Sequence, residues 1–416
     1  MEVKISDVFT PRLHYVNSAM YIDRPYHEDE LVKSIEGGRH TVICGESGSG
    51  KSWLYRHVAE QQGWAVYPAN CANAVRLKSL TEAIASVILK AGSQQMTEYN
   101  QLSEAGLGFG KTGASIQAER CYNVRQSEVL LQSFESARNQ AKNKRVVVVL
   151  DNLEAIFGKP DLMEELANII LLLDDPQYAA FNIKILIVGV PAEVVEYFQS
   201  IENLESVANR LQELRPLMSL TNRQIDLFLK RGFKDYLRAQ ISEIDLRDLR
   251  DHIQKVTLGI AQRLHEYCEI LAYRMQSNEW RFSKSLIRDC DSKYIGDCLK
   301  KSYAVIESFM NGKKTSTGRR NQVLYALGKI DITVFDANRI ERIVRAEFPN
   351  TTNGVSLAVG QILSELCVNE NKSPLLRRMG KVSAYRFADP RYLMCLRLML
   401  NKVPENERVY KLTLRR

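Results

Sequence analysis

The stretch TVICGESGSGKSW, from Thr41 to Trp53, decides the fold of this chain. The residues before the glycines are β-prone, and SWLYRHVAEQQ after them spaces its apolar residues as a helix does. A strand, a GxxxxGKS loop and a helix in this order predict a phosphate-binding loop. Gly45, Gly48 and Gly50 let the backbone turn back and aim its N–H groups inward, where a β-carbon would collide with phosphate.

This loop predicts a site for ATP and Mg²⁺. The N-terminus of the following helix supplies a favourable field for the anion. Lys51 is expected to reach the β- and γ-phosphates, and Ser52 to hold the metal. The residues expected to contact the nucleotide are Gly45, Glu46, Ser47, Gly48, Ser49, Gly50, Lys51, Ser52 and Trp53.

A second segment, KRVVVVLDNLEAIF, predicts the other half of the site. Val146 to Leu150 is a continuous apolar run, as in a central parallel strand, and Asp151 follows at its C-terminal end. Asp151 is therefore expected to hold Mg²⁺, directly or through water. The fold class predicted is α/β, a three-layer P-loop sheet domain over residues 1–216. A second Gly-Lys-Thr stretch, Gly106 to Ser115, has no strand before it and is expected to be a flexible hairpin or insertion.

These pieces, with KILIVGVP, ESVANRLQELRPLMSLT and TLGIAQRLHE, resemble the AAA+ and STAND branch of P-loop ATPases over roughly 60% of the chain. The likeness is closest to origin-recognition-type and transposition-regulator ATPases. It implies that Arg210 is an arginine finger that reaches a neighbour's γ-phosphate, so that hydrolysis depends on a homo-oligomer. A surface helix arginine is the alternative reading of Arg210. It also implies that GIAQR stands at the position of the family's second sensor, where Arg263 is the nearest arginine. The segment before the first helix lies near the base in such proteins, so the candidates for contact with adenine are Asp23, Arg24 and Pro25.

The chain departs from that family at three points. Asn152 stands where a typical AAA+ ATPase has the glutamate that polarises the attacking water, and Glu154 is the nearest substitute. The strand KILIVGVP ends in apolar residues where the family often has a polar first sensor, and Gln262 stands at the usual sensor arginine. The predicted catalytic set is Lys51, Asp151, Asn152, Glu154 and Arg210. Slow hydrolysis, as in a nucleotide-dependent switch, is therefore expected.

Beyond residue 216 the apolar spacing predicts a helical lid over 217–310 and, after a polar linker at Asn311 to Gln322, a basic domain over 311–416. In that domain three short helices precede two strands around a Met379-Gly380 turn, which is the winged-helix order. Its expected recognition helix, VSLAVGQILSELCVN, carries no Lys or Arg. The arginines and lysine expected to meet phosphates are Arg319, Arg320, Arg377, Arg378 and Lys381.

Charge and composition limit the partners. The net charge is +8, and residues 301–416 hold 21 Lys and Arg against 10 Asp and Glu. The whole basic excess thus lies in the last quarter, which favours contact with nucleic acid or an acidic partner. The eight scattered cysteines indicate reduced thiols rather than disulfides. No apolar stretch reaches membrane-spanning length and the N-terminus lacks a signal pattern, so a cytoplasmic protein without membrane contact is expected.

Two functions remain open on these residues. The first is an oligomerising ATP-dependent switch whose basic C-terminal domain contacts double-stranded DNA. The second is a STAND-like signalling or defence ATPase whose C-terminal domain binds an effector protein. Asn152 and the recognition helix without basic residues favour the second, and the basic tail favours the first.

Overall fold

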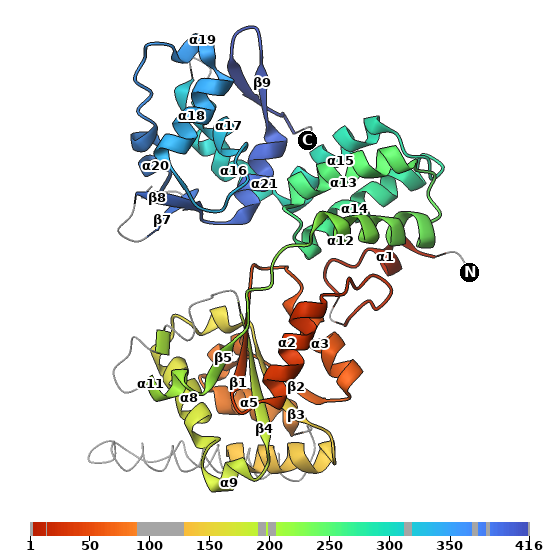
Figure 1. Cartoon of the computed structure of the whole chain (residues 1–416), viewed down its shortest axis with the longest axis vertical. Coiled ribbons are helices and arrows are strands. Elements are labelled where there is room, and N and C mark those ends of the chain that lie inside the picture. The colour runs from red at the N-terminus through yellow and green to blue at the C-terminus, as the bar shows by residue number, and fades with distance from the viewer. Residues whose placement is uncertain are drawn as a thin grey trace. The chain divides into compact units, whose positions relative to one another are not determined.

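The computed structural model describes residues 3–13, 15–89, 129–189, 197–198, 205–311, 318–367, 373–379 and 383–414. The chain divides into two compact units, which are treated separately below (Figure 1). One unit spans His14–Met218, and the other joins Met1–Leu13 to Ser219–Arg416. The expected Gly-Lys-Thr hairpin at 106–115 and the strand end at Val190 and Pro191 lie outside the described residues.

The His14–Met218 unit is built on a five-stranded sheet in the order β2-β3-β4-β1-β5, and all its neighbouring strands are parallel. Its strands are β1 (His40–Cys44), β2 (Ala65–Asn70), β3 (Val146–Asp151), β4 (Ile183–Gly189) and β5 (Leu211–Glu213). The α/β class and the parallel sheet expected from the valine run are confirmed. Because β1 and β3 are parallel strands of one sheet, the segments that follow them emerge at the same edge.

The sheet is covered on both faces, which makes the unit three-layered. Alternate residues of a strand point to opposite faces, so Val42 joins one core and Ile43 joins the other. Helices α2 (Pro25–Glu36) and α3 (Lys51–Gln62) pack on the Ile43 face (Figure 1). The Val42 face is covered by α4 (Cys71–Leu77), α5 (Leu80–Ile88), a helix over 129–141, α8 (Pro160–Leu172), α9 (Pro176–Ala179) and α11 (Glu205–Ala208).

The first part of the other unit is helical. Its elements are α1 (Ile5–Val8), α12 (Asn222–Leu229), a π-helix η2 (Lys230–Tyr236), α13 (Glu243–Thr257), α14 (Ala261–Gln276), α15 (Lys284–Cys298) and α16 (Lys300–Phe309). The N-terminal segment is tied to these helices, since Phe9 packs against Phe228 and Phe233 and the amide of Thr10 donates to Nδ1 of His265 at 3.0 Å. A buried imidazole that accepts this bond must be neutral.

The C-terminal part of the same unit alternates short helices with a small antiparallel sheet in the order β6-β8-β7. Its elements are α17 (Arg319–Leu327), β6 (Phe335–Asp336), α18 (Ala337–Glu347), α19 (Pro349–Thr352), α20 (Val359–Cys367), β7 (Leu376–Met379), β8 (Ala384–Phe387), α21 (Pro390–Met399), β9 (Leu400–Val403) and β10 (Arg408–Lys411). The three helices and two strands expected here are confirmed.

One boundary in this region was wrong. The linker was expected to run to Gln322, but α17 begins at Arg319, and Gly318, with a φ of 59°, is its N-cap. Asn311 fixes this helix start by two bonds: its Oδ1 accepts from the amide of Arg320, and its amide donates to Oδ1 of Asn321. The polar side chains of Asn311 and Asn321, which suggested a linker, therefore cap the start of a helix. Among the helices that the structure describes, none is both long and apolar enough to cross a bilayer.

Candidate nucleotide-binding site

The loop after β1 has the backbone that the glycines predicted. Gly45, Gly48 and Gly50 have φ angles of 153°, 83° and 99°, which side chains other than hydrogen rarely allow. A Cβ on Gly45 would lie 2.8 Å from the carbonyl oxygen of Leu217, so this glycine is also required by close packing. Gly50 is the N-cap of α3, and no side chain caps that helix start. The first-turn amides of α3 are thus left for a ligand.

Lys51 lies over the mouth of this loop. Its Nζ donates to the carbonyl oxygens of Gly45 at 2.8 Å and Glu46 at 3.0 Å. Burial lowers the pKa of Lys51, and the carboxylates of Glu154 and Asp151 act in the opposite direction. An ammonium group held by neutral carbonyls at a half-open loop can exchange them for phosphate oxygens, which bind it more strongly.

Ser49 gives an independent indication that the loop fits an anion. Its side chain is 1% exposed, and its Oγ has no hydrogen-bond partner among the described residues. A buried hydroxyl without a partner is costly, so native structures rarely leave one. Phosphate oxygens of a bound nucleotide are acceptors for such a hydroxyl.

The predicted metal ligands are brought together from two elements. Oγ of Ser52, in the first turn of α3, lies 3.2 Å from Oδ2 of Asp151 at the end of β3. Oδ1 of Asp151 accepts from the amide of Asn152 at 2.9 Å, which leaves Oδ2 directed toward Ser52. One carboxylate and one hydroxyl oxygen match the preference of Mg²⁺ for a few protein oxygens beside substrate phosphates. The donor set therefore fits this ion.

The turn after β3 explains two features of the sequence. Asn152 has φ of 61°, a left-handed conformation that Asn tolerates and that begins the short helix η1 (Leu153–Ala155). The exposed carboxylate of Glu154 follows this turn. The negative charges of Glu154 and Asp151 both oppose the effect of burial on the pKa of Lys51, so Glu154 acts electrostatically at the phosphate loop.

Arg24 has a role that the sequence did not indicate. Expected near a base, it is 9% exposed and donates from Nη2 to the carbonyl oxygen of Ser49 at 2.9 Å and from Nη1 to that of Met218 at 2.6 Å. The guanidinium therefore braces the phosphate loop against the end of the unit. Burial lowers the pKa of Arg24, and the Glu28 carboxylate partly offsets this. Pro25 is the first residue of α2.

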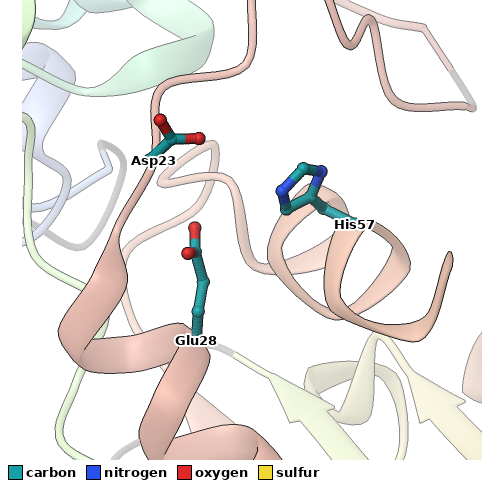
Figure 2. A group of neighbouring side chains, drawn as sticks. All are labelled: Asp23, Glu28 and His57. Atoms are coloured by element: carbon teal, nitrogen blue, oxygen red, sulfur yellow. The ribbon is translucent and has the colours of Figure 1, made fainter. Parts of the chain in front are cut away.

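Beside this brace lie Asp23, Glu28 and His57, whose side chains point toward one another from the segment before α2, from α2 and from α3 (Figure 2). Their candidate ligand atoms all lie within 4.8 Å of one another. The carboxylate of Glu28 already accepts from the hydroxyl of Tyr21 and the amide of Arg24. The group thus anchors the start of α2.

Arg210, the candidate arginine finger, lies at the N-terminal ends of the strands β1 and β5, whereas the phosphate loop of the same chain follows the C-terminal end of β1. It immediately precedes β5, and its carbonyl oxygen accepts from the amide of His40, the first residue of β1. The phosphate loop follows Cys44 at the other end of β1, roughly 13 Å away at about 3.3 Å per residue. Its guanidinium is bound to the carboxylate of Asp174, so it is not a free surface side chain.

Arg263, the candidate second sensor, lies in the first turn of α14, in the other unit. Its Nη1 donates to both carboxylate oxygens of Glu266, at 3.0 and 2.7 Å, and Nε2 of Gln262 donates to the same carboxylate. Glu266 is buried, so the pair is shielded from water.

The basic residues expected to meet phosphates fall into two groups. Arg319 donates to the carbonyl oxygen of Thr351, Arg320 pairs with Glu365, and Arg378 donates to Ser364. These three are engaged within the domain, while Lys381 lies outside the described residues. Among the described members of this set, only Arg377 has a side chain without a hydrogen bond or ion pair to a described residue.

Arg377 and Arg386 face each other across β7 and β8 as a register pair. Both side chains are exposed, and neither has an ion pair with a described residue. Two like charges opposite each other on adjacent strands destabilise a sheet unless an anion lies between them. Sequence reasoning missed Arg386 because it is 9 positions from Arg377 along the chain, and only the strand register joins the two.

Comparisons with known proteins agree with this geometry. Residues 34–198 match the family model described as an AAA domain, a stretch that includes the phosphate loop and Asp151. No curated protein matches the chain. Among solved structures, the Walker-type ATPase of Pyrococcus abyssi aligns with a TM-score of 0.51 at 14% identity, over 91% of this chain and 96% of its own. The ORC2 protein of Aeropyrum pernix in its ADP form aligns with a TM-score of 0.50 at 15% identity, over 95% and 97%.

The phosphate loop, the acidic strand and the three-layer parallel sheet define a P-loop nucleotide-binding protein. Within that class, residues 34–198 match the model of an AAA domain, in agreement with the resemblance to AAA+ ATPases. Over 95% of its length the chain shares the fold of the ORC2 protein from Aeropyrum pernix.

Proposed function

We propose that this protein is an ATP-binding switch that hydrolyses ATP slowly, assembles into an oligomer, and contacts DNA through its C-terminal domain. The observation that carries the nucleotide part is the meeting of Ser52 and Asp151 beside a loop whose buried Ser49 hydroxyl lacks a partner. Bound ATP would be held by the loop amides and Lys51, with Mg²⁺ at Ser52 and Asp151. The metal would neutralise charge on the phosphates when bound.

Slow hydrolysis is supported by the residues around the γ-phosphate position. Asn152 can orient a water but cannot accept its proton, because an amide has no basic site. Glu154 is a carboxylate whose charge acts on Lys51, and it is exposed on a short helix rather than held on the strand. A base that is solvated and loosely held transfers a proton less efficiently than one fixed beside the water.

Assembly is supported by the position of Arg210. This residue cannot reach its own phosphate loop from the opposite edge of the sheet, roughly 13 Å away along β1. A neighbouring copy that presents its phosphate loop to this edge could use it. Hydrolysis would then require two subunits, so turnover would rise with protein concentration.

DNA contact is supported by the paired arginines of the small sheet. The order α17, β6, α18, α20, β7 and β8, with sheet order β6-β8-β7, is that of a winged helix. The wing carries Arg377 and Arg386 side by side, and a phosphate between them would relieve their repulsion. Contacts of this kind position a protein on a duplex without reading its sequence.

One observation favours the second candidate, a signalling ATPase that binds an effector protein. Helix α20, the expected recognition helix, carries Glu365 and no basic residue, and Glu365 already pairs with Arg320. Such a helix offers an amphipathic surface with little attraction for a polyanion.

One experiment tests the proposal as a whole. The mass of the particle and the rate of ATP hydrolysis are measured with and without duplex DNA, over a range of protein concentrations. The proposal expects a rate per subunit that rises with concentration and a mass that grows with ATP. It also expects a DNA affinity that falls with salt. A rate independent of concentration contradicts assembly, and a stoichiometric protein partner without DNA affinity favours the second candidate.

A further inference from the structure

Asp174 holds the guanidinium of Arg210 in a defined orientation. Nε of Arg210 donates to Oδ2 of Asp174 at 2.5 Å, and Nη1 donates to the carbonyl oxygen of Ser206 at 2.7 Å. These two bonds fix the plane of the guanidinium from two sides. Nη2, the remaining nitrogen, has no partner among the described residues. The outward end of the fork is therefore available to an anion.

The supports on both sides of this pair are rigid. The backbone of Arg210 is fixed by its amide, which donates to Val207, and by its carbonyl, which accepts from His40. Asp174 lies in the turn between α8 and α9, where its amide donates to Leu171. Asp175, the next residue, caps α9 through its side chain. Neither end of the pair can move far without breaking these bonds.

The ion pair between Arg210 and Asp174 contributes little to the free energy of unfolding. The side chains of Arg210 and Asp174 are 32% and 57% exposed, and ion pairs at such exposure add little to stability. Asp174 also borders an open surface cavity of about 1180 Å³, together with Glu164 and Asp175.

We infer that Asp174 is a positioning residue for the arginine finger: it aligns Arg210 so that Nη2 meets the γ-phosphate bound by a neighbouring subunit. This inference rests on the proposed function, because it needs Arg210 to act on a second copy of the chain. A long side chain without such a support would sample many rotamers, and each would have to be lost in the transition state. The acidic partner thus raises the turnover of the neighbour's site and leaves its ATP affinity unchanged.

Mixed assemblies test the inference, because they separate the subunit that gives the finger from the one that holds ATP. A Lys51→Ala subunit retains Arg210 but binds ATP about 100-fold more weakly, so it stays empty at limiting ATP, and an Arg210→Ala subunit binds ATP but lacks the finger. Neither should hydrolyse ATP alone, while their equimolar mixture should. Adding Asp174→Ala to the Lys51→Ala subunit should lower kcat of the mixture about tenfold, with KM within twofold. Adding Asp174→Ala to the Arg210→Ala subunit should change neither kcat nor KM of the mixture.

Two further variants complete the design. Glu164→Gln removes an exposed carboxylate at the same cavity and should leave the mixture unchanged in either subunit. Asp174→Glu in the finger-giving subunit should restore part of the lost kcat, since it keeps the charge. Thermal melting of each variant and ATP binding by the Arg210→Ala, Asp174→Ala subunit verify that the chain folds.

The outcomes are distinguishable. An active mixture that is insensitive to Asp174→Ala, or that loses activity equally whichever subunit carries the change, overturns the role of Asp174 alone. A mixture no more active than its separate components rejects the trans-acting finger, and the inference about Asp174 falls with it.

Discussion

Oγ of Ser52 lies 3.2 Å from Oδ2 of Asp151, although 99 positions separate the two residues in the chain. The contact joins the first turn of α3 to the end of β3, on either side of the place where a metal-bound triphosphate would lie. It depends on the parallel sheet, because only parallel β1 and β3 send their following segments to the same edge.

Lys51→Ala should weaken ATP binding by about two orders of magnitude. The ammonium group makes charge-assisted bonds worth about 3 kcal/mol, and each 1.4 kcal/mol is a tenfold change in Kd. Titration with a fluorescent ATP analogue measures the effect. Lys33→Ala is the matched control, since Lys33 is exposed and pairs only with Asp29. Equal affinity of wild type and Lys51→Ala would show that the loop is not the nucleotide site.

Glu154→Gln should lower the rate of ATP hydrolysis at least tenfold and leave ATP affinity within about threefold. A general base typically contributes 10²–10⁴-fold, and a loosely held one is expected to contribute less. Single-turnover hydrolysis with ATP labelled at the γ-phosphate measures the chemical step. Glu82→Gln, a substitution in the first turn of α5, serves as the control. An unchanged single-turnover rate would mean that Glu154 does not act on the attacking water.

Arg24→Ala should destabilise the His14–Met218 unit by about 3 kcal/mol, because the carbonyl oxygens of Ser49 and Met218 lose a charged donor. Nucleotide affinity should fall as well, since the loop loses its brace. Urea unfolding in a Trp280→Phe background, followed by the fluorescence of Trp53 and Trp64, reports on this unit. Arg24→Lys, which can keep one of the two bonds, should fall between wild type and Arg24→Ala. A variant as stable as wild type would refute the bracing role.

Arg377→Gln combined with Arg386→Gln should weaken duplex DNA binding and make it less dependent on salt. If both arginines neutralise phosphates, the slope of log affinity against log salt should become smaller in magnitude by about 1.8. Fluorescence anisotropy at several salt concentrations measures the slope for duplexes of unrelated sequence. Removing one exposed charge from each unit, with Arg76→Gln and Arg288→Gln, is the control of equal net charge. No change in slope for the wing variant would exclude these contacts.

Acid should destabilise the unit that contains His265. Burial lowers the pKa of His265 to about 3, while an unfolded chain has a histidine pKa of about 6.5. Below pH 6.5 the unfolded state therefore binds a proton that the folded state excludes, and stability falls until the pH approaches 3. The loss is roughly 2 kcal/mol between pH 6.5 and 5.

His265→Asn tests that prediction, since an amide oxygen can accept the Thr10 bond and does not titrate. Its free energy of unfolding should depend less on pH by the same amount. The buried His40 has its pKa lowered to about 4, chiefly by burial, and acts in the same direction in both proteins, so it cancels in the comparison. Parallel stability profiles for the two proteins would rule out His265 as the source.

Local pattern alone was enough to predict the candidate nucleotide site. A strand, a glycine loop and a helix are adjacent in sequence, and each glycine needed for a positive φ is visible as a residue type. The valine run and its terminal Asp151 were equally clear, because a strand buried on both faces must be apolar throughout. The α/β class, the parallel sheet and the two halves of the site therefore followed from the amino-acid sequence.

Only tertiary structure decided which distant side chains meet. The bracing of the loop by Arg24, the binding of Arg210 by Asp174 and the pairing of Arg377 with Arg386 each join residues from different elements. The position of Glu154 depends on a left-handed turn at Asn152, and the residue type at 152 does not by itself predict that conformation. Such contacts are set by strand register and helix packing, which sum many weak long-range interactions, and no local spacing of residue types encodes them.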